Sequence, residues 1–293
     1  MTGPVDSTTL GARALAVGYE RRPVIDGLDV DVPPGLITSI VGPNACGKST
    51  LLKALVRLLT PRAGAVLLDG ADINRLPTLE VARRIGFLPQ GLTSPAGILV
   101  ADLVARGRYP HQGPLHRTTA DDDRAVAEAM VMTGIDPLAD RPVDELSGGQ
   151  RQRVWIAMAL AQNTSILLLD EPTTYLDVTH QIEVLDLLVD LHLTGRTVVM
   201  VMHDLNLAAR YSHHLLAMAD GAIVATGPPA SVVSDRLLSS VFGIEGHIVV
   251  DTATGAPQIT PLGRHHLHGP TVTPDSPDDR PEANPLVTQG ENR

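Results

Sequence analysis

Residues 42–50 carry the stretch that decides the fold, and they read Gly42-Pro43-Asn44-Ala45-Cys46-Gly47-Lys48-Ser49-Thr50. This stretch matches the phosphate-binding loop pattern G-x-x-x-x-G-K-[ST] without a gap. The apolar residues 36–41 before it read as a strand, and residues 51–59 after it read as a helix. This is the strand-loop-helix context that the pattern needs, so the sequence predicts a site for a nucleoside triphosphate with Mg²⁺.

The chemistry of this loop follows from its hydrogen-bond donors. Backbone N–H groups of the loop and of the helix N-terminus point at phosphate oxygens, Lys48 reaches the β and γ oxygens, and the Ser49 hydroxyl ligates the metal. The alternative is a plain glycine-rich turn before a helix. The chain contains only two lysines, Lys48 and Lys53, so a chance match to the pattern is a rare event in this composition.

The bulk composition limits the classes of protein to consider. The chain has 293 residues, 43% of them hydrophobic, which suffices for one large or two modest domains with full cores. A net charge of −10, few aromatic residues and no dense basic run argue against a nucleic-acid binder. We expect neither a membrane span nor a secretory signal in the sequence. The single cysteine, Cys46, fits a reducing cytosolic compartment.

The order of apolar runs and turn signals indicates an α/β fold. Residues 13–41 predict an antiparallel hairpin half open to solvent. Residues 98–161 lack strand-like runs and predict a helical insertion, with helices at 98–107, 119–133 and 150–161. Elsewhere we expect strands at 65–70, 85–90, 166–169, 198–202 and 214–218, with helices at 178–193 and 205–211. Pro, Gly, His and Asp dominate from 256 onward, which is the composition of a disordered tail.

Two carboxylates follow the apolar run at 166–169. Asp170 and Glu171 would stand at the carboxyl end of a buried strand, where open α/β sheets bind their ligands. Asp170 would hold the Mg²⁺ with its waters, and Glu171 would polarise or deprotonate the water that attacks the γ-phosphate. A solvated turn after a core strand is the alternative, and the phosphate loop upstream favours the functional interpretation.

A second anion-binding element starts at Ser147-Gly148-Gly149-Gln150. Ser147 is placed as a helix N-cap, and the two glycines expose backbone N–H groups at the helix start. With Leu146 and Arg151, this stretch looks like the signature motif of the ATP-binding cassette (ABC) proteins, which the whole chain resembles over about 11–250. The resemblance implies that the signature of one subunit closes over the nucleotide on the phosphate loop of another, in a head-to-tail dimer.

The resemblance also assigns further residues. It implies that Tyr19 stacks on adenine, that Gln90 joins the metal site to the helical insertion, and that Asp177 communicates across the dimer. It implies that His203 hydrogen-bonds the γ-phosphate and holds the attacking water. Taken singly, Tyr19 could serve packing, Gln90 could be a polar loop residue, and His203 could be structural. Ala45 stands where many cassettes carry glycine, so we expect its backbone not to need a positive φ.

The fold that the resemblance implies is an ABC-type phosphate-loop NTPase with a RecA-like core, an antiparallel β subdomain and an inserted helical subdomain. We expect a flexible N-terminus over residues 1–10, the ATPase domain over 11–255 with its helical subdomain at about 93–162, and the disordered tail over 256–293. Within the family, stretches such as Arg106-Gly107-Arg108-Tyr109-Pro110-His111 are similar to ATPase subunits of importers for ferric siderophores, haem and cobalamin.

The resemblance implies partners as well. These are a second copy or a paralogous ATPase, integral membrane permease subunits, and indirectly an extracytoplasmic substrate-binding protein, with no nucleic acid. The chain would work at the cytoplasmic face of the membrane, hydrolysing ATP with Mg²⁺ for ferric siderophore import. An ATPase of a haem or cobalamin importer, an exporter ATPase, and a non-transport cassette protein are the alternatives.

Overall fold

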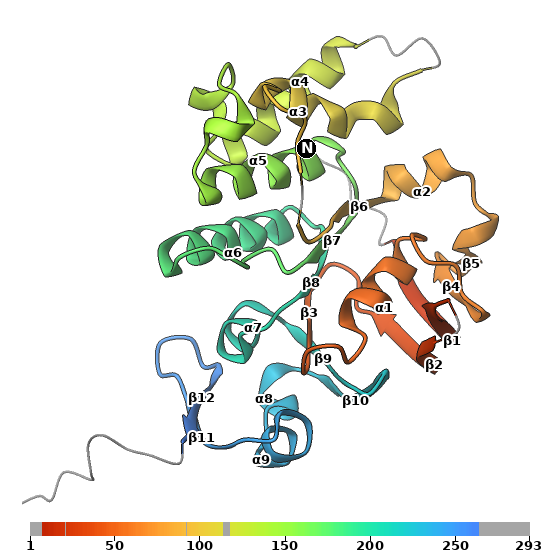
Figure 1. Ribbon diagram of the computed structural model, residues 1–293, viewed down its shortest axis with the longest axis vertical. Helices are drawn as coiled ribbons and strands as arrows, with labels where there is room; N and C mark the ends of the chain where they lie inside the picture. The colour runs from red at the N-terminus through yellow and green to blue at the C-terminus, as the bar shows by residue number, and fades with distance from the viewer. Residues whose placement is uncertain (1–7, 21, 92, 114–117, 264–293) are drawn as a thin grey trace, which may run out of the picture. The chain divides into compact units, whose positions relative to one another are not determined.

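A computed structural model describes residues 8–20, 22–91, 93–113 and 118–263 (Figure 1). Its central sheet has six strands in the order β10-β9-β3-β8-β7-β6. Each strand from β9 to β6 runs parallel to its neighbour, whereas β10 is antiparallel to β9. This confirms the prediction of parallel strands. The bounds are β3 (Ile37–Val41), β6 (Ile85–Leu88), β7 (Ile166–Asp170), β8 (Thr197–Val201), β9 (His214–Ala219) and β10 (Ala222–Gly227).

Alternate residues of the parallel strands face two apolar cores. In β7, Ile166 and Leu168 join the core that also contains residues of α1 and the antiparallel sheet. Leu167 and Leu169 point the other way, into the core that contains residues of the inserted helices. Because both faces of the sheet are covered, the strand reads as a continuous apolar run rather than an alternating one.

The N-terminal residues form a separate antiparallel sheet in the order β2-β1-β4-β5. In β2 the side chains of Ile25, Leu28, Val30 and Val32 are buried, and exposed residues alternate with the last three of them. The predicted antiparallel hairpin is thereby confirmed with its solvent-facing side, but it spans Leu10–Val32, and residues 37–41 of the predicted range form β3 of the central sheet. The bounds are β1 (Leu10–Tyr19), β2 (Arg22–Val32), β4 (Ala63–Leu68) and β5 (Ala71–Asp72).

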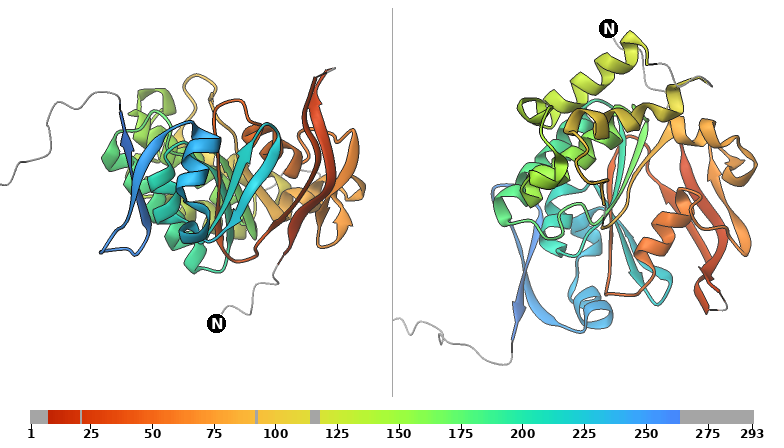
Figure 2. Two further views of the ribbon diagram at one scale, coloured as in Figure 1. Left: turned by 90° about the horizontal axis from the view of Figure 1, so that it is seen from below. Right: turned by 45° about the horizontal axis from the view of Figure 1, so that its top comes forward.

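The described part of the insertion consists of helices and 3₁₀ turns joined by short irregular segments, with one isolated β-bridge between Leu99 and Pro142. It contains α3 (Val100–Ala105), α4 (Ala120–Met132) and α5 (Gly148–Ala161), which contact one another (Figures 1 and 2). Three short 3₁₀ turns connect them, and one of these, Arg106–His111, takes over where the helix expected at 98–107 was to continue. Pro110 lies inside that turn, where it cannot donate an α-helical hydrogen bond.

The remaining helices flank the central sheet. They are α1 (Lys48–Leu55), α2 (Thr78–Arg84), α6 (Val178–Leu193), α7 (Leu205–Tyr211), α8 (Pro229–Val232) and α9 (Asp235–Leu237), followed by a π-helical turn at Leu238–Phe242. Both α6 and α7 have their predicted bounds. The helix expected at 51–59 lies earlier, because Gly47 at φ 109° precedes its start and Arg57 at φ 62° follows its end.

The predictions for both ends need correction. Residues 257–262, expected in the disordered tail, form β12 (Pro257–Leu262), which pairs with β11 (Glu245–Val250). The side chain of Ile259 is buried in this hairpin. The segment is therefore ordered by its packing, although its composition is rich in turn-forming residues. Leu10, expected in the flexible N-terminus, pairs with Val32 and Leu68 in the antiparallel sheet. Residues 1–7 and 264–293 of these two predictions lie outside the described residues.

Candidate nucleotide-binding and hydrolysis site

The phosphate loop connects β3 to α1, as its pattern predicts. Lys48 is 5% exposed, and its Nζ donates hydrogen bonds to the carbonyl oxygens of Gly42 and Pro43, both at 2.8 Å. At Gly42 a Cβ would stand 2.2 Å from the carbonyl oxygen of Met218, so only glycine fits at φ 150°. The loop therefore holds a buried ammonium group beside the N-terminus of α1, which is the arrangement for binding phosphate.

One expectation for this loop is wrong. Ala45 has a φ of 63°, in the left-handed region that favours glycine. Three residues of the loop have a positive φ, namely Gly42, Ala45 and Gly47. The backbone path of the loop thus places Ala45 in this conformation although it is not a glycine. An alanine there carries a local backbone cost of about 1 kcal/mol that glycine would avoid.

Ser49 and Asp170 meet at the carboxyl end of β7. The Ser49 Oγ donates to Asp170 Oδ1 at 2.8 Å, and the carboxylate is almost completely buried. Burial raises the pKa of Asp170, while the hydrogen bond from Ser49 opposes that rise and the charge of Glu171 adds to it. A hydroxyl and a carboxylate are hard oxygen ligands, and a cation would relieve the cost of the buried charge. These residues therefore fit Mg²⁺.

Three side chains contact the carboxylate of Glu171. Its Oε2 accepts hydrogen bonds from Gln90 Nε2 and from Thr174 Oγ1, the latter at 3.0 Å. Its Oε1 contacts His203 Nε2. Glu171 stands directly after β7, Gln90 after β6 and His203 after β8, so three neighbouring parallel strands deliver the cluster to one edge of the sheet. The structure thus joins three predicted site residues.

Thr174 belongs to this cluster and was not among the predicted site residues. Its hydroxyl is one turn beyond the carboxylate that it contacts, within the residues that connect β7 to α6. The spacing Glu-x-x-Thr after a strand is the signal that could have identified it, because a side chain three residues on can reach back in a turn.

Tyr19 lies at the end of β1 and is 45% exposed. A cavity brings it together with the phosphate loop, Glu171 and His203. The lining residues of this cavity are Tyr19, Val24, Asn44, Ala45, Gly47, Lys48, Ser49, Thr50, Glu171 and His203. The ring therefore stands where a base attached to loop-bound phosphates would need an aromatic surface.

The signature residues lie at the start of α5. Ser147 caps the helix: its Oγ accepts from the backbone N–H of Gln150, and Gln150 Oε1 accepts from the backbone N–H of Ser147. This confirms the predicted cap and adds its reciprocal bond. Neither Ser147, Gly149 nor Gln150 is among the described residues that line the phosphate-loop cavity. In the same chain, Gly148 and Arg151 instead line a neighbouring pocket together with Gln90, Asp170 and Glu171.

Asp177 is the N-cap of α6. Its Oδ1 accepts from the backbone N–H of His180 at 2.9 Å and contacts the His180 ring nitrogen Nδ1 at 2.7 Å, which holds the pKa of Asp177 below its usual value. The ring of His180 also covers Gly149, where a Cβ would stand 2.4 Å from the ring carbon Cδ2. His180, which the sequence interpretation missed, therefore ties Asp177 to the signature.

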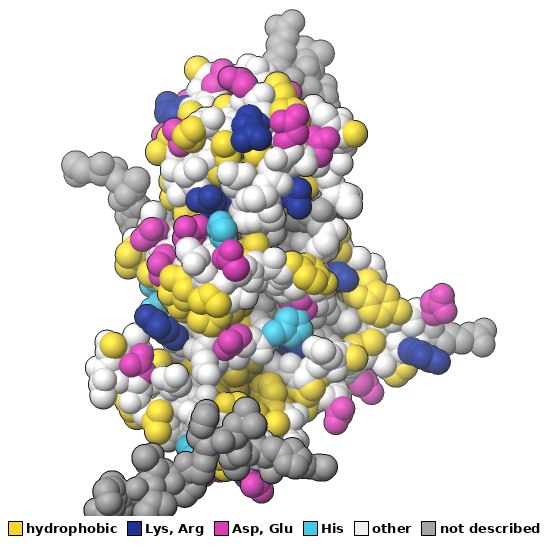
Figure 3. Space-filling model, turned by 60° about the vertical axis from the view of Figure 1, so that its left-hand side comes forward, with side chains coloured by type: hydrophobic (Ala, Val, Ile, Leu, Met, Phe, Trp, Pro, Cys, Tyr) yellow, Lys and Arg dark blue, Asp and Glu magenta, His cyan; other side chains and the backbone are white. Residues whose placement is uncertain are grey.

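The surface charge is dispersed on the face shown in Figure 3. Lys and Arg side chains stand singly among acidic, histidine and apolar side chains there.

No described helix is both long enough and apolar enough to cross a bilayer.

The comparison with known proteins decides the family. The model of the family described as "ABC transporter" matches residues 25–174. The chain belongs to the ABC transporter family. It is 52% identical over 256 residues to the ferric enterobactin transport ATP-binding protein FepC of Escherichia coli, covering 87% of this chain and 94% of that protein.

Two further similarities agree with this assignment. The iron(3+)-hydroxamate import ATP-binding protein FhuC of Bacillus subtilis is 46% identical over 85% of this chain and 93% of its own length. The ATP-binding cassette MJ0796, in a dimeric post-hydrolysis state with ADP and Pi, has a TM-score of 0.66 and 28% identity, covering 75% of this chain and 98% of that one. This ABC cassette is an ATPase, and its fold is the phosphate-loop α/β fold that the sequence predicted.

Proposed function

We propose that this ABC cassette is the ATPase subunit of a ferric siderophore importer. The observation that carries the ATPase part is the convergence of Gln90, Thr174 and His203 on the Glu171 carboxylate, next to the Ser49–Asp170 pair. The names of the similar ferric enterobactin and ferric hydroxamate proteins support the class of transported molecule.

The hydrolytic roles follow from the positions of the side chains. Lys48 and the backbone N–H groups from Asn44 to Thr50 bind the triphosphate, and Tyr19 stacks on the adenine. Ser49, Asp170 and Gln90 would hold Mg²⁺, which neutralises phosphate charge. Glu171 orients the attacking water, and His203 donates a hydrogen bond toward the γ-phosphate.

A second copy of the chain completes the site in this proposal. The signature Ser147–Gln150 forms a capped helix start, yet it does not line the phosphate-loop cavity of its own chain. In a head-to-tail dimer each signature meets the nucleotide of the other copy, and Asp177 beside it takes part in that contact. The dimeric structure of the similar cassette supports this arrangement.

The membrane partners are proposed on the same basis. The cassette docks on integral permease subunits at the cytoplasmic face of the membrane, through the helical insertion and the loop around Gln90. An extracytoplasmic binding protein loads the permease and acts on the cassette only indirectly. Closure and reopening of the dimer drive the permease. Haem and cobalamin importers and exporters share the same ATPase chemistry, so only transport separates them.

Uptake of labelled iron tests the proposal. A deletion strain is supplied with a ferric catecholate or a ferric hydroxamate under iron limitation, and either the wild-type gene or the Glu171→Gln gene is restored. We expect lost uptake of at least one ferric siderophore, restored by the wild type alone. Unchanged uptake of both siderophores would refute the siderophore assignment, and loss confined to haem or cobalamin would transfer the assignment to that substrate.

A further inference from the structure

The C-terminal hairpin is bound to the first turn of α7 by a single side chain. Asn206 Nδ2 donates to the carbonyl oxygen of Ile259 at 3.0 Å, and the backbone N–H of Ile259 donates to Asn206 Oδ1 at 2.7 Å. The side-chain amide thus forms the same pair of bonds that a residue of a neighbouring strand would form with β12. We call the hairpin, residues 245–262, the strap.

Packing reinforces this contact. The Ile259 side chain is 5% exposed and belongs to the same apolar core as Ala208 and Ala209 of α7. Asn206 itself is half-buried, so its two hydrogen bonds are partly shielded from competing water. The strap therefore shares an apolar core with α7 and is joined to it by the paired hydrogen bonds of Asn206.

The helix that the strap holds begins directly after the hydrolytic histidine. Asp204 caps α7 by accepting from the backbone N–H of Leu207, and His203 is the residue before this cap. The far end of α7 is fixed by Tyr211, whose hydroxyl donates to Asp186 of α6 at 3.0 Å. The strap thus contacts α7 at the end nearest to His203, in addition to the Asp204 cap.

His203 depends on this support, because it has little packing of its own. Its side chain is 44% exposed, whereas Glu171, which it contacts, is 9% exposed. The position of the imidazole relative to the carboxylate is then set mainly by the backbone between β8 and α7. A small movement of the first turn of α7 would change the distance between His203 and Glu171.

We propose that the strap positions His203 for hydrolysis, with Asn206 as the positioning residue that connects the two. The inference rests on the proposed role of His203 in ATP hydrolysis. Asn206 does not touch nucleotide in this scheme. It acts on the turnover step through the backbone of residues 203–206, so its loss reduces kcat while ATP binding is preserved.

The test compares variants of the full chain in steady-state ATP hydrolysis. Asn206→Leu keeps the branched shape of the side chain and removes both hydrogen bonds, and Asn206→Asp keeps the acceptor for the Ile259 N–H. Thr254→Ala is the control, since it removes two hydrogen bonds, one to Asp251 and one from the Ala256 N–H, in the turn of the same strap without touching α7. The affinity for ATP and the thermal midpoint are measured for each variant.

We expect Asn206→Leu to lower kcat about tenfold, which corresponds to about 1.4 kcal/mol of lost positioning, with the KM for ATP changed less than about twofold. The kcat of Asn206→Asp should lie between those of Asn206→Leu and the wild type. The kcat of Thr254→Ala should equal that of the wild type. If Asn206→Leu does not fold, the Asp variant decides, since an unchanged kcat there overturns the inference.

Other outcomes also overturn the inference. These are a wild-type kcat in Asn206→Leu, an equal loss of kcat in Thr254→Ala, or a loss of ATP binding parallel to the loss of kcat. His203→Ala separates this inference from the proposed function. A retained kcat in His203→Ala removes the role of His203 itself, whereas an inactive His203→Ala with a normal Asn206→Leu removes only the role of the strap.

Discussion

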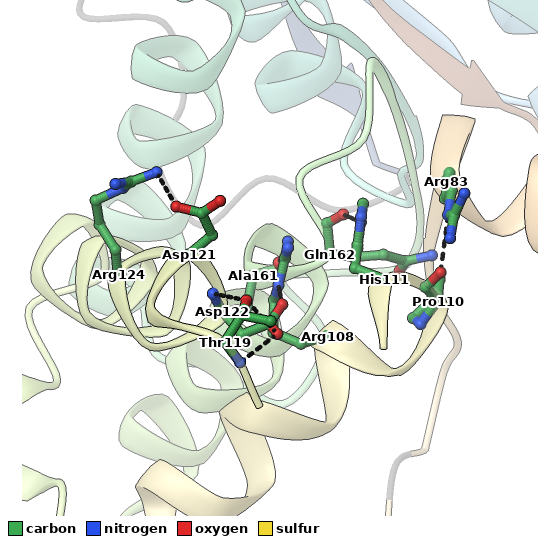
Figure 4. A network of polar contacts seen from close by, with 10 residues as sticks. All are labelled: Arg83, Arg108, Pro110, His111, Thr119, Asp121, Asp122, Arg124, Ala161 and Gln162. Carbon is green, nitrogen blue, oxygen red and sulfur yellow. Dashed lines mark hydrogen bonds and ion pairs between the residues drawn. The ribbon is translucent and has the colours of Figure 1, made fainter. Parts of the chain in front are cut away.

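The buried ion pair of the helical insertion gives a quantitative prediction for stability. Arg108 and Asp122 have side chains that are 8% and 4% exposed, and Arg108 Nε donates to Asp122 Oδ1 at 2.8 Å. The same guanidinium donates to the carbonyl oxygen of Ala161 at the end of α5, at 2.7 Å (Figure 4). Arg108 thus connects the 3₁₀ turn after α3 to the start of α4 and to the end of α5.

Replacing Arg108 by Met should destabilise the protein by about 3 kcal/mol, because it leaves the Asp122 carboxylate buried without its cation. For a chain of this size that corresponds to a fall of about 9 °C in the thermal midpoint. The double variant Arg108→Met with Asp122→Asn should recover at least half of the loss, since Asn keeps the capping bonds of Thr119 and carries no charge. Denaturant unfolding of the four proteins measures this coupling.

The pH dependence of this loss has a definite sign. The hydrogen bond from Arg108 is the main cause that holds the pKa of Asp122 below its ordinary value of 3.8. A depressed pKa in the folded protein contributes stability above the unfolded value and loses it as pH falls through the folded value. The difference between wild type and Arg108→Met should therefore shrink below about pH 4. A loss under 1 kcal/mol at neutral pH, or additive effects in the double variant, would refute this reasoning.

Three further predictions concern the phosphate loop and the metal site. Lys48→Ala should weaken ATP binding by about tenfold or more in calorimetry, since a buried charged donor to phosphate is lost; unchanged affinity would contradict its role. Ala45→Gly should raise the thermal midpoint by roughly 1–3 °C, as glycine relieves the positive φ, and a lower midpoint would count against that strain. Asp170→Asn should abolish Mg²⁺-dependent hydrolysis yet raise nucleotide-free stability. The raised pKa of Asp170 means that its charge costs stability as pH rises through the folded value, so a less stable variant at neutral pH would be inconsistent.

Much of the site could be predicted from sequence because its residues are set by local patterns. The phosphate loop needs its glycines and lysine within nine consecutive residues, and Asp170 and Glu171 follow directly from the end of a buried strand. The bounds of α6 and α7 agree with the prediction because each helix has an acidic N-cap, Asp177 and Asp204 respectively. Each cap directly precedes the apolar residues that repeat with helical spacing.

The parts that escaped prediction depend on contacts between distant residues. Strand β12 forms although its surroundings have a tail-like composition, because it pairs with β11 and because Asn206, 53 residues before Ile259, forms two hydrogen bonds with the Ile259 backbone. The positive φ of Ala45 is imposed by the loop path and leaves no mark in the residue type. His180 could not be connected to Gly149 from sequence, since their contact requires α5 and α6 to be packed first.

The resemblance to siderophore importers rested partly on Arg106-Gly107-Arg108-Tyr109-Pro110-His111, and the structure gives most of this stretch an internal role. Gly107 has no room for a Cβ beside the carbonyl of Met158, and His111 contacts the carbonyl oxygen of Gln162. The Pro110 carbonyl accepts from Arg83 of α2 (Figure 4). The stretch thus fixes the insertion to the core.

Hydrolysis by Glu171→Gln tests the central claim most directly. The variant removes the carboxylate charge at the point where Gln90, Thr174 and His203 converge, and it preserves the shape of the side chain. Single-turnover hydrolysis with Mg²⁺ and ATP, followed by size-exclusion chromatography, should show ATP retained in a stable dimer and a rate reduced by about 10²–10⁴-fold. Turnover near the wild-type rate would contradict the assignment of Glu171 and the mechanism built on it.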